Sequence, residues 1–327
     1  MPAVRPLSLR ARTGLIVAWA ALCALGFALL LVPAISALGG GWDFLPLYAG
    51  GKLAGTPGLY NPDVVRGAEM AAAHRTGPAL LFIRPPFVAG LIWPLAQLPY
   101  DAAHSLWMAL RLFAVLGFIL LWPHCLPYLT ALACAWFVPL AGAIANGQDD
   151  PFLLLWIALA ERWRDGRPFA AGLALSLCLV KFHLFLLLPL FLWTHRRRLV
   201  PGFLAGCAVL GLISLVAGGP SWPRAYLAIL KLPQISPGSH TMPNLHGLQL
   251  PAPLELTLSL AVLIAAVFAI RRLSARAALA VTIAGGILLS SHVYFADLTL
   301  LLPALLIFAP QRVPQPILDP RPAAALH

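Results

Sequence analysis

The run LIVAWAALCALGFALLLVPAISAL, residues 15–38, decides the fold class of this chain. A helix of about 20 apolar residues crosses the hydrocarbon core of a bilayer, and this run carries no charged residue. It is too long for the apolar core of a signal peptide, which spans about 7–15 residues. Arg5, Arg10 and Arg12 precede it. We therefore predict an uncleaved first transmembrane helix with its N-terminus in the cytoplasm.

Composition extends this interpretation to the whole chain. Hydrophobic residues make up 61% of the 327 residues and charged residues only 10%, whereas soluble domains average about 45–50% and about 25%. The apolar runs are long and do not alternate, which favours helices over a β-barrel. We expect an all-α polytopic membrane protein with roughly 10–12 transmembrane helices. It should form one domain over residues 1–309, followed by a Pro-rich cytoplasmic tail, 310–327.

The net charge of +11 indicates membrane lipids rather than nucleic acid as a partner. The basic residues cluster in short loops, as the cytoplasmic loops of membrane proteins do, and such loops suit anionic head groups. The loops 161–167, 195–198 and 271–276 are predicted to be cytoplasmic. This assignment places the polar connections 39–80 and 218–252 on the extracytoplasmic side.

The number of helices between residues 103 and 193 stays open. Segment 103–160 fits three crossings, or two crossings and a re-entrant piece. The basic loops 161–167 and 195–198, on either side of segment 169–193, fall on the same side of the membrane if this segment is a broken hairpin with Lys181 at its tip.

Asp43 is the first candidate for chemistry. It follows the first apolar run directly, in GWDFLPLYAGGK (residues 41–52), in a chain with only 11 Asp and Glu residues. Tyr48 and the small residues after it allow close approach of a ligand. An isolated carboxylate beside a bilayer is costly unless it is solvated, paired or used. We expect Asp43 to be used in function.

Two cations stand beside or inside apolar segments. Lys181 lies near the middle of segment 169–193, where a lysine costs about 2.5–3.5 kcal/mol on insertion scales. It is predicted either to meet an anionic ligand group such as a lipid phosphate or to snorkel toward an interface. Arg84, before Pro85 and Pro86, is predicted equally as a ligand contact or as an interfacial anchor.

Two further sets of acids have competing interpretations. Gln148, Asp149 and Asp150 form a polar knot between apolar segments, which is predicted to bind a sugar or cation, or else to be a solvated turn. Asp297 begins the last helix, where a carboxylate typically caps the N-terminus.

Histidines and cysteines give no metal or disulfide signature. His240, His246 and His292 fall on the predicted outer side, but none has a metal-ligand spacing, so we expect them to hydrogen-bond a substrate. The five cysteines have no paired spacing, which favours packing roles. Phosphate-binding and nucleophile-elbow motifs are missing from the sequence. No cofactor and no metal is therefore predicted.

A set of short motifs resembles glycosyltransferase family 87. The residues that carry the resemblance cover most of 40–305: Asp43-Phe44, Tyr48-Ala49-Gly50, Leu59-Tyr60, Arg84-Pro85-Pro86-Phe87, Pro94-Leu95, Leu98-Pro99, Trp107, Asn146-Gly147-Gln148, Lys181, Ser291-His292-Val293-Tyr294 and Asp297-Leu298. The chain departs from the family pattern at three places. Lys181 is followed by Phe rather than Pro, Arg84 replaces Tyr, and Asp149-Asp150 replaces a hydrophobe and Asn.

The resemblance implies a GT-C fold and a mannosyltransferase of a bacterial inner membrane. Such enzymes take a sugar, typically mannose, from a polyprenyl-phosphate donor and transfer it to a lipid or glycan hydroxyl on the extracytoplasmic side, with inversion. Carried over, Asp43 would be the general base. Lys181, Arg84 and a histidine of 240–246 would stabilise the leaving phosphate. Tyr48, Gln148 and Tyr294 would contact the sugar.

Two other function classes remain open from the sequence. A transporter or flippase for lipid-linked saccharides would also bury charges, although no paired repeat is visible. A non-catalytic binder of the same lipids would have the same architecture. Asp43 discriminates between these classes, because only the enzyme requires a base at that position.

Overall fold

The computed structural model describes residues 9–38, 42–73, 80–232 and 239–309. Every regular element in these ranges is a helix and none is a strand. The predicted tail, 310–327, lies outside the described residues. The all-α fold class is therefore confirmed for the described part of the chain.

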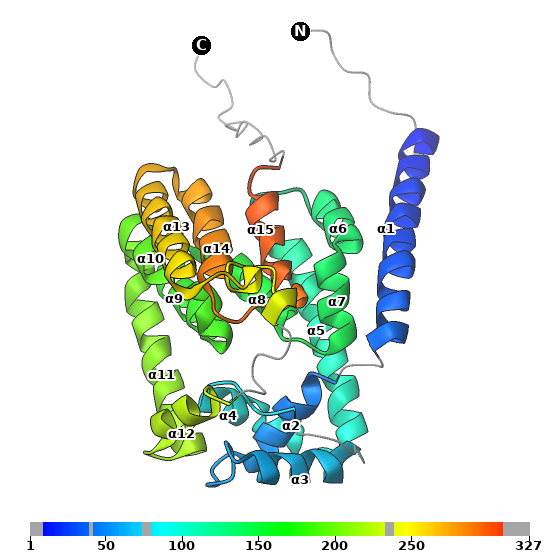
Figure 1. Cartoon of the computed structure of the whole chain (residues 1–327). Helices are drawn as coiled ribbons and strands as arrows, with labels where there is room; N and C mark the ends of the chain where they lie inside the picture. The colour runs from blue at the N-terminus through cyan, green and yellow to red at the C-terminus, as the bar shows by residue number, and fades with distance from the viewer. Residues whose placement is uncertain (1–8, 39–41, 74–79, 233–238, 310–327) are drawn as a thin grey trace, which may run out of the picture.

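The first helix is the most isolated element of the bundle. Helix α1 (Leu9–Leu38) contains the predicted span, and only 6% of its most apolar window is buried inside the protein. It packs on α6 (Pro127–Trp136) and α7 (Val138–Asn146), where Trp136 Nε1 donates to the Leu22 carbonyl at 3.0 Å. The rest of its apolar surface is free to face lipid (Figure 1).

Among the described residues, five helices are long and apolar enough to cross a membrane, or six if one bent helix pair counts as a single span. By length and composition the candidates are Thr13–Ile35, Tyr100–Leu121, Pro168–Phe185, Arg197–Gly218 and Ala252–Arg272, of which Pro168–Phe185 contains the break at Lys181 described below. The protein is thus polytopic, as predicted. The count is below the expected 10–12, because other apolar segments fold as short helices such as α4 (Pro86–Ala96), α14 (Ala275–Leu289) and α15 (Leu301–Leu306).

The segment between residues 103 and 160 forms three parts. Helix α5 (Tyr100–Leu121) is one continuous helix, α6 and α7 form the pair bent by 69°, and α8 (Asp150–Trp163) follows a tight turn. The bend falls at Phe137, which has extended backbone angles, between the two short helices. Hydropathy alone does not resolve such a break.

The predicted hairpin with Lys181 at its tip is present. Helix α9 (Pro168–Leu177) leads into a 3-10 segment, Cys178–Phe185, whose helical geometry breaks at Lys181 with φ −120° and ψ 54°. Helix α10 (Leu188–His195) then returns to the end from which α9 started, because Arg196 Nε comes within 3.7 Å of Glu161 Oε1.

The three basic loops gather at one end of the bundle. Glu161 is buried and binds His124 Nε2 at 2.8 Å and Arg164 Nη1 at 2.6 Å. His195 Nε2 lies 2.5 Å from the Ile270 carbonyl, at the end of α13 (Ala252–Arg272). Glu161 therefore joins the positively charged loops that follow α8 and α10, and His195 joins the second of these loops to the end of α13.

Short helices occupy the other end of the bundle (Figure 1): α2 (Phe44–Leu53), α3 (Pro62–Ala73), α4 and α12 (Trp222–Ile229). Helix α2 packs closely on α4, since a Cβ on Gly51 would lie only 2.9 Å from Ala96 Cβ. The predicted polar connections 39–80 and 218–252 supply α2, α3 and α12. This packing fixes the start of α2, where Asp43 lies.

Candidate active site

A polar cavity of about 100 Å³ lies where five distant parts of the chain meet. Helix α2, the segment before α4, the turn between α7 and α8, and the segments around Lys181 and Tyr294 form its wall. The lining residues are Asp43, Pro46, Leu47, Leu80, Leu81, Phe82, Ile83, Arg84, Gln148, Lys181, His183, His292, Tyr294 and Asp297. Six of the predicted site residues are thus brought together: Asp43, Arg84, Gln148, Lys181, His292 and Tyr294.

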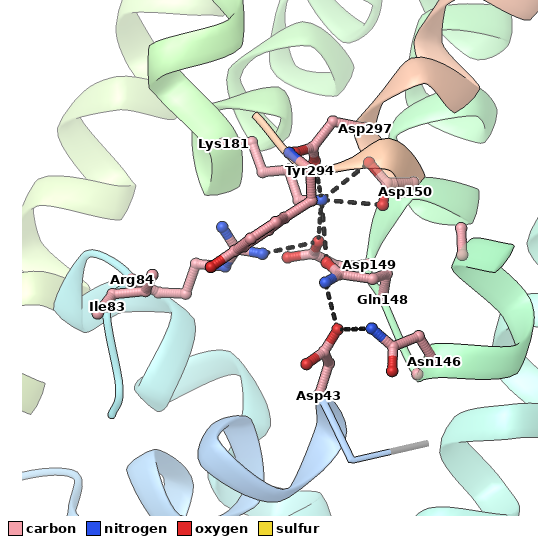
Figure 2. A network of polar contacts seen from close by, with 12 residues as sticks. Asp43, Ile83, Arg84, Asn146, Gln148, Asp149, Asp150, Lys181, Tyr294 and Asp297 are labelled. Atoms are coloured by element: carbon pink, nitrogen blue, oxygen red, sulfur yellow. Dashed lines mark hydrogen bonds and ion pairs between the residues drawn. The ribbon is translucent and has the colours of Figure 1, made fainter. Parts of the chain in front are cut away.

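Asp43 is held in place by the turn between α7 and α8 (Figure 2). Its backbone N–H donates to the Asn146 carbonyl at 3.0 Å. Its Oδ2 accepts hydrogen bonds from both the Asn146 and the Gln148 side-chain amides. Oδ1 has no hydrogen-bond partner among the described residues. One carboxylate oxygen is thus anchored, and the other is available to a ligand in the cavity.

Burial raises the pKa of Asp43 above the usual range for an aspartate. The hydrogen bond from Gln148 and the charges of Lys181 and Arg84 oppose this rise without cancelling it. A carboxylate with a raised pKa is a stronger base than one in water, provided that it is ionised at the working pH.

Gly147, which has a left-handed backbone conformation, places the side-chain amides of Asn146 and Gln148 within reach of Asp43. Gly147 ends α7 with φ +88°, a conformation that side chains rarely adopt. The Trp107 indole donates to the Gly147 carbonyl at 2.9 Å. The turn therefore has a fixed shape and presents Asn146 and Gln148 together.

Arg111 supports the same turn from α5. Its side chain is fully buried and donates to the carbonyls of Ala143 at 3.1 Å, Ile144 at 3.0 Å and Gln148 at 3.3 Å. The Ala143 carbonyl also accepts from the N–H groups of Gly147 and Gln148. The guanidinium therefore adds to the backbone hydrogen bonds of this turn, and Arg111 is one of the residues that the sequence reasoning missed.

Lys181 is the hub of the charged network. Its Nζ lies 2.5 Å from Asp297 Oδ1, 2.9 Å from both oxygens of Asp150 and 3.1 Å from Asp149 Oδ1. It also lies 3.1 Å from Gln148 Oε1. The side chain points inward and does not snorkel. An ammonium group has three donors, and here protein oxygens already engage them.

The polar knot after Gly147 is not a solvated turn. Gln148, Asp149 and Asp150 are 8%, 3% and 0% exposed, and all three contact Lys181. Asp149 Oδ1 also pairs with Arg84 Nη2 at 3.0 Å, while its Oδ2 is buried and has no partner in the described parts of the chain. The two acids belong to the framework around the cavity and do not line it.

Arg84 is the cation with donors left over for a ligand. Asp149 is its one side-chain partner among the described residues, and a guanidinium has five N–H donors. Tyr60 fixes the backbone here by donating from its hydroxyl to the Arg84 carbonyl at 2.8 Å. The side chain lines the cavity, so a contact with an anionic group is geometrically open.

The segment around Tyr294 closes the cavity on the remaining side. Asp297 Oδ2 accepts from the Tyr294 N–H at 2.6 Å, which is the predicted N-terminal capping role, while its other oxygen binds Lys181. His292 packs edge-on against Tyr294, with ring centroids 4.6 Å apart, and faces His183 at 6.2 Å. Among the described residues neither His292 ring nitrogen has a hydrogen-bond partner, and burial lowers the pKa of this histidine. His292 thus has unused hydrogen-bonding capacity at the cavity.

Three predicted site residues lie outside the cavity. The Tyr48 hydroxyl donates to the Leu98 carbonyl at 2.8 Å, because Tyr48 is on the face of α2 that packs against Tyr100. His246 Nδ1 pairs with Glu255 at 3.0 Å, and His240 is exposed in a separate turn. None of the three lines the cavity.

Asn146 and His183 are additional site residues. Asn146 directly precedes Gly147, and its position in a polar knot was the available signal. His183 lies two residues after Lys181 on the same segment. Within the part of the chain that the structure describes, no group of three His, Cys, Asp or Glu side chains is arranged to hold a metal ion.

The family comparison agrees with this geometry. A family model described as glycosyltransferase family 87 matches residues 82–296, more than half of the chain. The matched range contains Arg84, Gln148, Lys181, His292 and Tyr294, while Asp43 lies before it. No match was found among curated proteins or among solved structures.

Proposed function

Because the chain belongs to glycosyltransferase family 87 and is a multi-pass membrane protein, it is a membrane glycosyltransferase, and we propose its donor, chemistry and base. The donor is a polyprenyl-phosphate sugar, with mannose as the sugar. The acceptor is a hydroxyl of a membrane lipid or glycan on the extracytoplasmic side. Transfer proceeds with inversion, and Asp43 is the general base.

The anchoring of Asp43 carries this proposal. Two amides hold Oδ2, which leaves Oδ1 without a partner at the cavity wall. In the proposed step, Oδ1 takes the proton of the acceptor hydroxyl while that oxygen attacks the anomeric carbon. The bond from that carbon to the phosphate oxygen breaks, and the polyprenyl phosphate leaves with the electron pair. A positioned general base contributes about 10²–10⁴-fold to such a step.

Arg84 and His292 are the proposed contacts of the leaving phosphate. Arg84 keeps free donors at the cavity, and the His292 ring nitrogens have no partner among the described residues. Fixed donors aimed at developing negative charge stabilise a transition state. Lys181 acts differently from the sequence-based expectation, because three carboxylates and an amide surround it. Its proposed role is to hold the acids and Gln148 in place. Gln148 and Tyr294 remain candidate sugar contacts.

The gathering of basic loops supports the proposed orientation. The loops after α8, α10 and α13 meet at one end, which the positive-inside rule assigns to the cytoplasm. The short helices that carry Asp43 lie at the other end (Figure 1). We therefore propose an extracytoplasmic active site in a bacterial inner membrane, formed within a single domain over residues 1–309.

The donor class is tested with purified protein in proteoliposomes. We expect labelled mannose to pass to an acceptor lipid extract from polyprenyl-phosphate mannose and not from nucleotide-linked mannose. The anomeric configuration of the product, compared with that of the donor by NMR, checks inversion. Direct use of the nucleotide sugar, or retention of configuration, would contradict the proposal.

The pH profile of kcat/KM reports on the base. Transfer needs ionised Asp43, so the rate should fall about tenfold per pH unit below its raised pKa. The hydrogen bond from Gln148 favours the ionised form, so its removal in Gln148→Leu raises that pKa further. We expect the acid limb of the profile to move to higher pH in this variant. A limb that stays in place or moves to lower pH would remove Gln148 from this role.

A further inference from the structure

A second space in the bundle is an apolar groove between α8 and α11 (Val200–Gly218), with a volume of about 390 Å³. Trp156 and Trp163 line it from α8, and Gly206 and Val209 line it from α11. Helix α9 packs against both of these helices and supplies the residues between the two walls. No residue lines both this groove and the active-site cavity. The α8–α11 groove is therefore separate from the candidate active site.

One end of the α8–α11 groove lies at the basic end of the bundle. Trp163 is the last residue of α8, Ala170 is the third residue of α9, and both line the groove. The basic loop 164–167 joins these two helices. From Trp156 to Trp163 the lining covers about 10 Å of helix. The groove therefore runs from this loop into the apolar part of the bundle.

Three exposed arginines lie beside this end of the groove. Arg162 is in the last turn of α8, and Arg167 directly precedes the first residue of α9. Arg198 belongs to the loop before α11, which packs on α9 so closely that a Cβ on Gly172 would lie 2.1 Å from the Leu199 carbonyl oxygen. In the part of the chain that the structure describes, none of the three guanidinium groups has a hydrogen-bond or ion-pair partner. Each therefore keeps its donors for a ligand.

The acids nearby do not neutralise these arginines. Asp165 pairs with Arg164 Nε at 3.1 Å, and Glu161 pairs with Arg164 Nη1 at 2.6 Å. Glu161 also lies 3.7 Å from Arg196 Nε. Both acids thus have cationic partners of their own. The positive charge beside the groove is uncompensated and is complementary to an anionic group.

Another apolar groove provides a comparison. It lies beside Trp93 and Val216 and has a similar volume, about 410 Å³. Lys52 is the one cation within three sequence positions of its lining residues. A lipid chain can pack in either groove, but of these two only the α8–α11 groove has a cluster of arginines at its end.

We propose that the α8–α11 groove binds a phospholipid with an anionic head group, an inference that does not depend on the proposed sugar transfer. The lipid phosphate contacts Arg162, Arg167 and Arg198, and one acyl chain lies in the groove. Lipid chains are as apolar as the groove, so the chain itself gives little net attraction. Selectivity comes from charge, since each arginine near the membrane surface strengthens the binding of an anionic lipid about fivefold. The amphipathic ring of Trp163 suits the head-group level.

The direct test is photo-crosslinking in phosphatidylcholine vesicles that contain the full chain and a trace of a phospholipid probe with a diazirine on its acyl chain. A phosphatidylglycerol probe is compared with a phosphatidylcholine probe. We expect the phosphatidylglycerol probe to label the peptides that contain residues 156–163 and 170–177 at least about tenfold more strongly. The two probes should label the groove beside Trp93 to similar extents. Equal labelling of the α8–α11 groove by both probes, or no labelling there, would overturn the proposal.

Replacing Arg162, Arg167 and Arg198 together with glutamine should remove this preference. Labelling of the groove by the phosphatidylglycerol probe should fall at least about tenfold, to the level of the phosphatidylcholine probe. The other arginines of the same loops remain, so the loops stay basic and the orientation in the membrane is kept. A preference that survives in this variant would remove the arginines from the site.

Replacing Arg271, Arg272 and Arg276 with glutamine is the matched control. It removes the same charge from the third basic loop, which supplies no residue to the groove. Labelling of the groove should stay unchanged. An equal loss of labelling in both triple variants would show a general effect of net charge and would overturn the site.

Val209→Trp tests the apolar part of the site. Val209 is exposed on α11 and lines the groove, so a larger ring there occupies space that the acyl chain needs. Leu204 is also exposed on α11 but lines neither of the two grooves compared, which makes Leu204→Trp the control. We expect labelling by the phosphatidylglycerol probe to fall about fivefold or more in Val209→Trp and to stay unchanged in Leu204→Trp. Equal labelling of these two variants would remove the groove from the site.

Competition identifies the source of the phosphate. Unlabelled phosphatidylglycerol should displace the probe from the wild-type protein, whereas millimolar inorganic phosphate and unlabelled phosphatidylcholine should not. Displacement by inorganic phosphate would show a site for free anions, and equal displacement by phosphatidylcholine would show a site without charge selection. Either result would overturn the proposal.

Discussion

Asp43→Asn is expected to lower kcat of sugar transfer by about 10²–10⁴-fold, the range that a positioned general base supplies. Asparagine keeps the size of the side chain and can still accept the hydrogen bonds from Asn146 and Gln148. It cannot take the proton of the acceptor hydroxyl. The variant should therefore fold and bind donor normally, and fail in the chemical step. Labelled mannose transfer at matched protein levels measures this loss.

The matched control is Asp63→Asn. Asp63 is exposed in the first turn of α3 and lies away from the cavity. It should retain wild-type kcat, which shows that the loss at Asp43 is not a general effect of removing a carboxylate. Transfer by Asp43→Asn within a few-fold of wild type would remove Asp43 from the mechanism. That result would favour a non-catalytic contact with the acceptor.

Lys181→Met is expected to destabilise the folded protein by about 3–5 kcal/mol, the cost of removing one partner from a buried charge network. Methionine fills similar space but leaves Asp150 and Asp297 without their cation. Both acids are almost completely buried, at 0% and 3% exposure. Thermal unfolding in detergent, followed by tryptophan fluorescence, should show a clear drop in the transition temperature.

A double variant distinguishes charge imbalance from lost packing. Lys181→Met combined with Asp150→Asn removes one of the uncompensated charges, so it should be more stable than Lys181→Met alone. Lys231→Met is the control, because Lys231 is exposed after α12. A Lys181→Met protein as stable as wild type would show that the network contributes nothing to folding. A double variant less stable than Lys181→Met would contradict the charge explanation.

The sequence predicts the fold class well because the bilayer imposes simple requirements. Spans such as 15–38 need only length and apolarity, and polar groups in apolar runs are rare enough to identify Asp43 and Lys181. The count of spans was less predictable. The 69° bend between α6 and α7 depends on backbone geometry at Phe137, and average hydropathy does not report that geometry.

The partners of these residues could not be predicted, because they depend on contacts between distant segments. Lys181 is separated by 116 residues from Asp297 and by 31 from Asp150, so a cation that seemed free for a ligand is paired. Arg111 was not identified from the sequence, because its three carbonyl partners lie 32, 37 and 33 residues further along the chain. His240 and His246 shared a predicted side with Asp43, but sharing a side of the membrane does not place residues in one site.

Asp43 and Tyr294 are the ends of one continuous series of polar contacts that runs through Gln148, Lys181 and Asp297. Figure 2 shows this series crossing from α2 to the last segment of the chain. When Asp43 takes a proton, Gln148 loses its charged acceptor, and charge-assisted bonds are roughly twice as strong as neutral ones. We therefore expect a proton on Asp43 to weaken this series of contacts as far as the partly exposed Tyr294. We expect Asp43→Asn, which mimics the protonated base, to speed amide exchange in residues 292–297, and unchanged exchange would show that the two ends act independently.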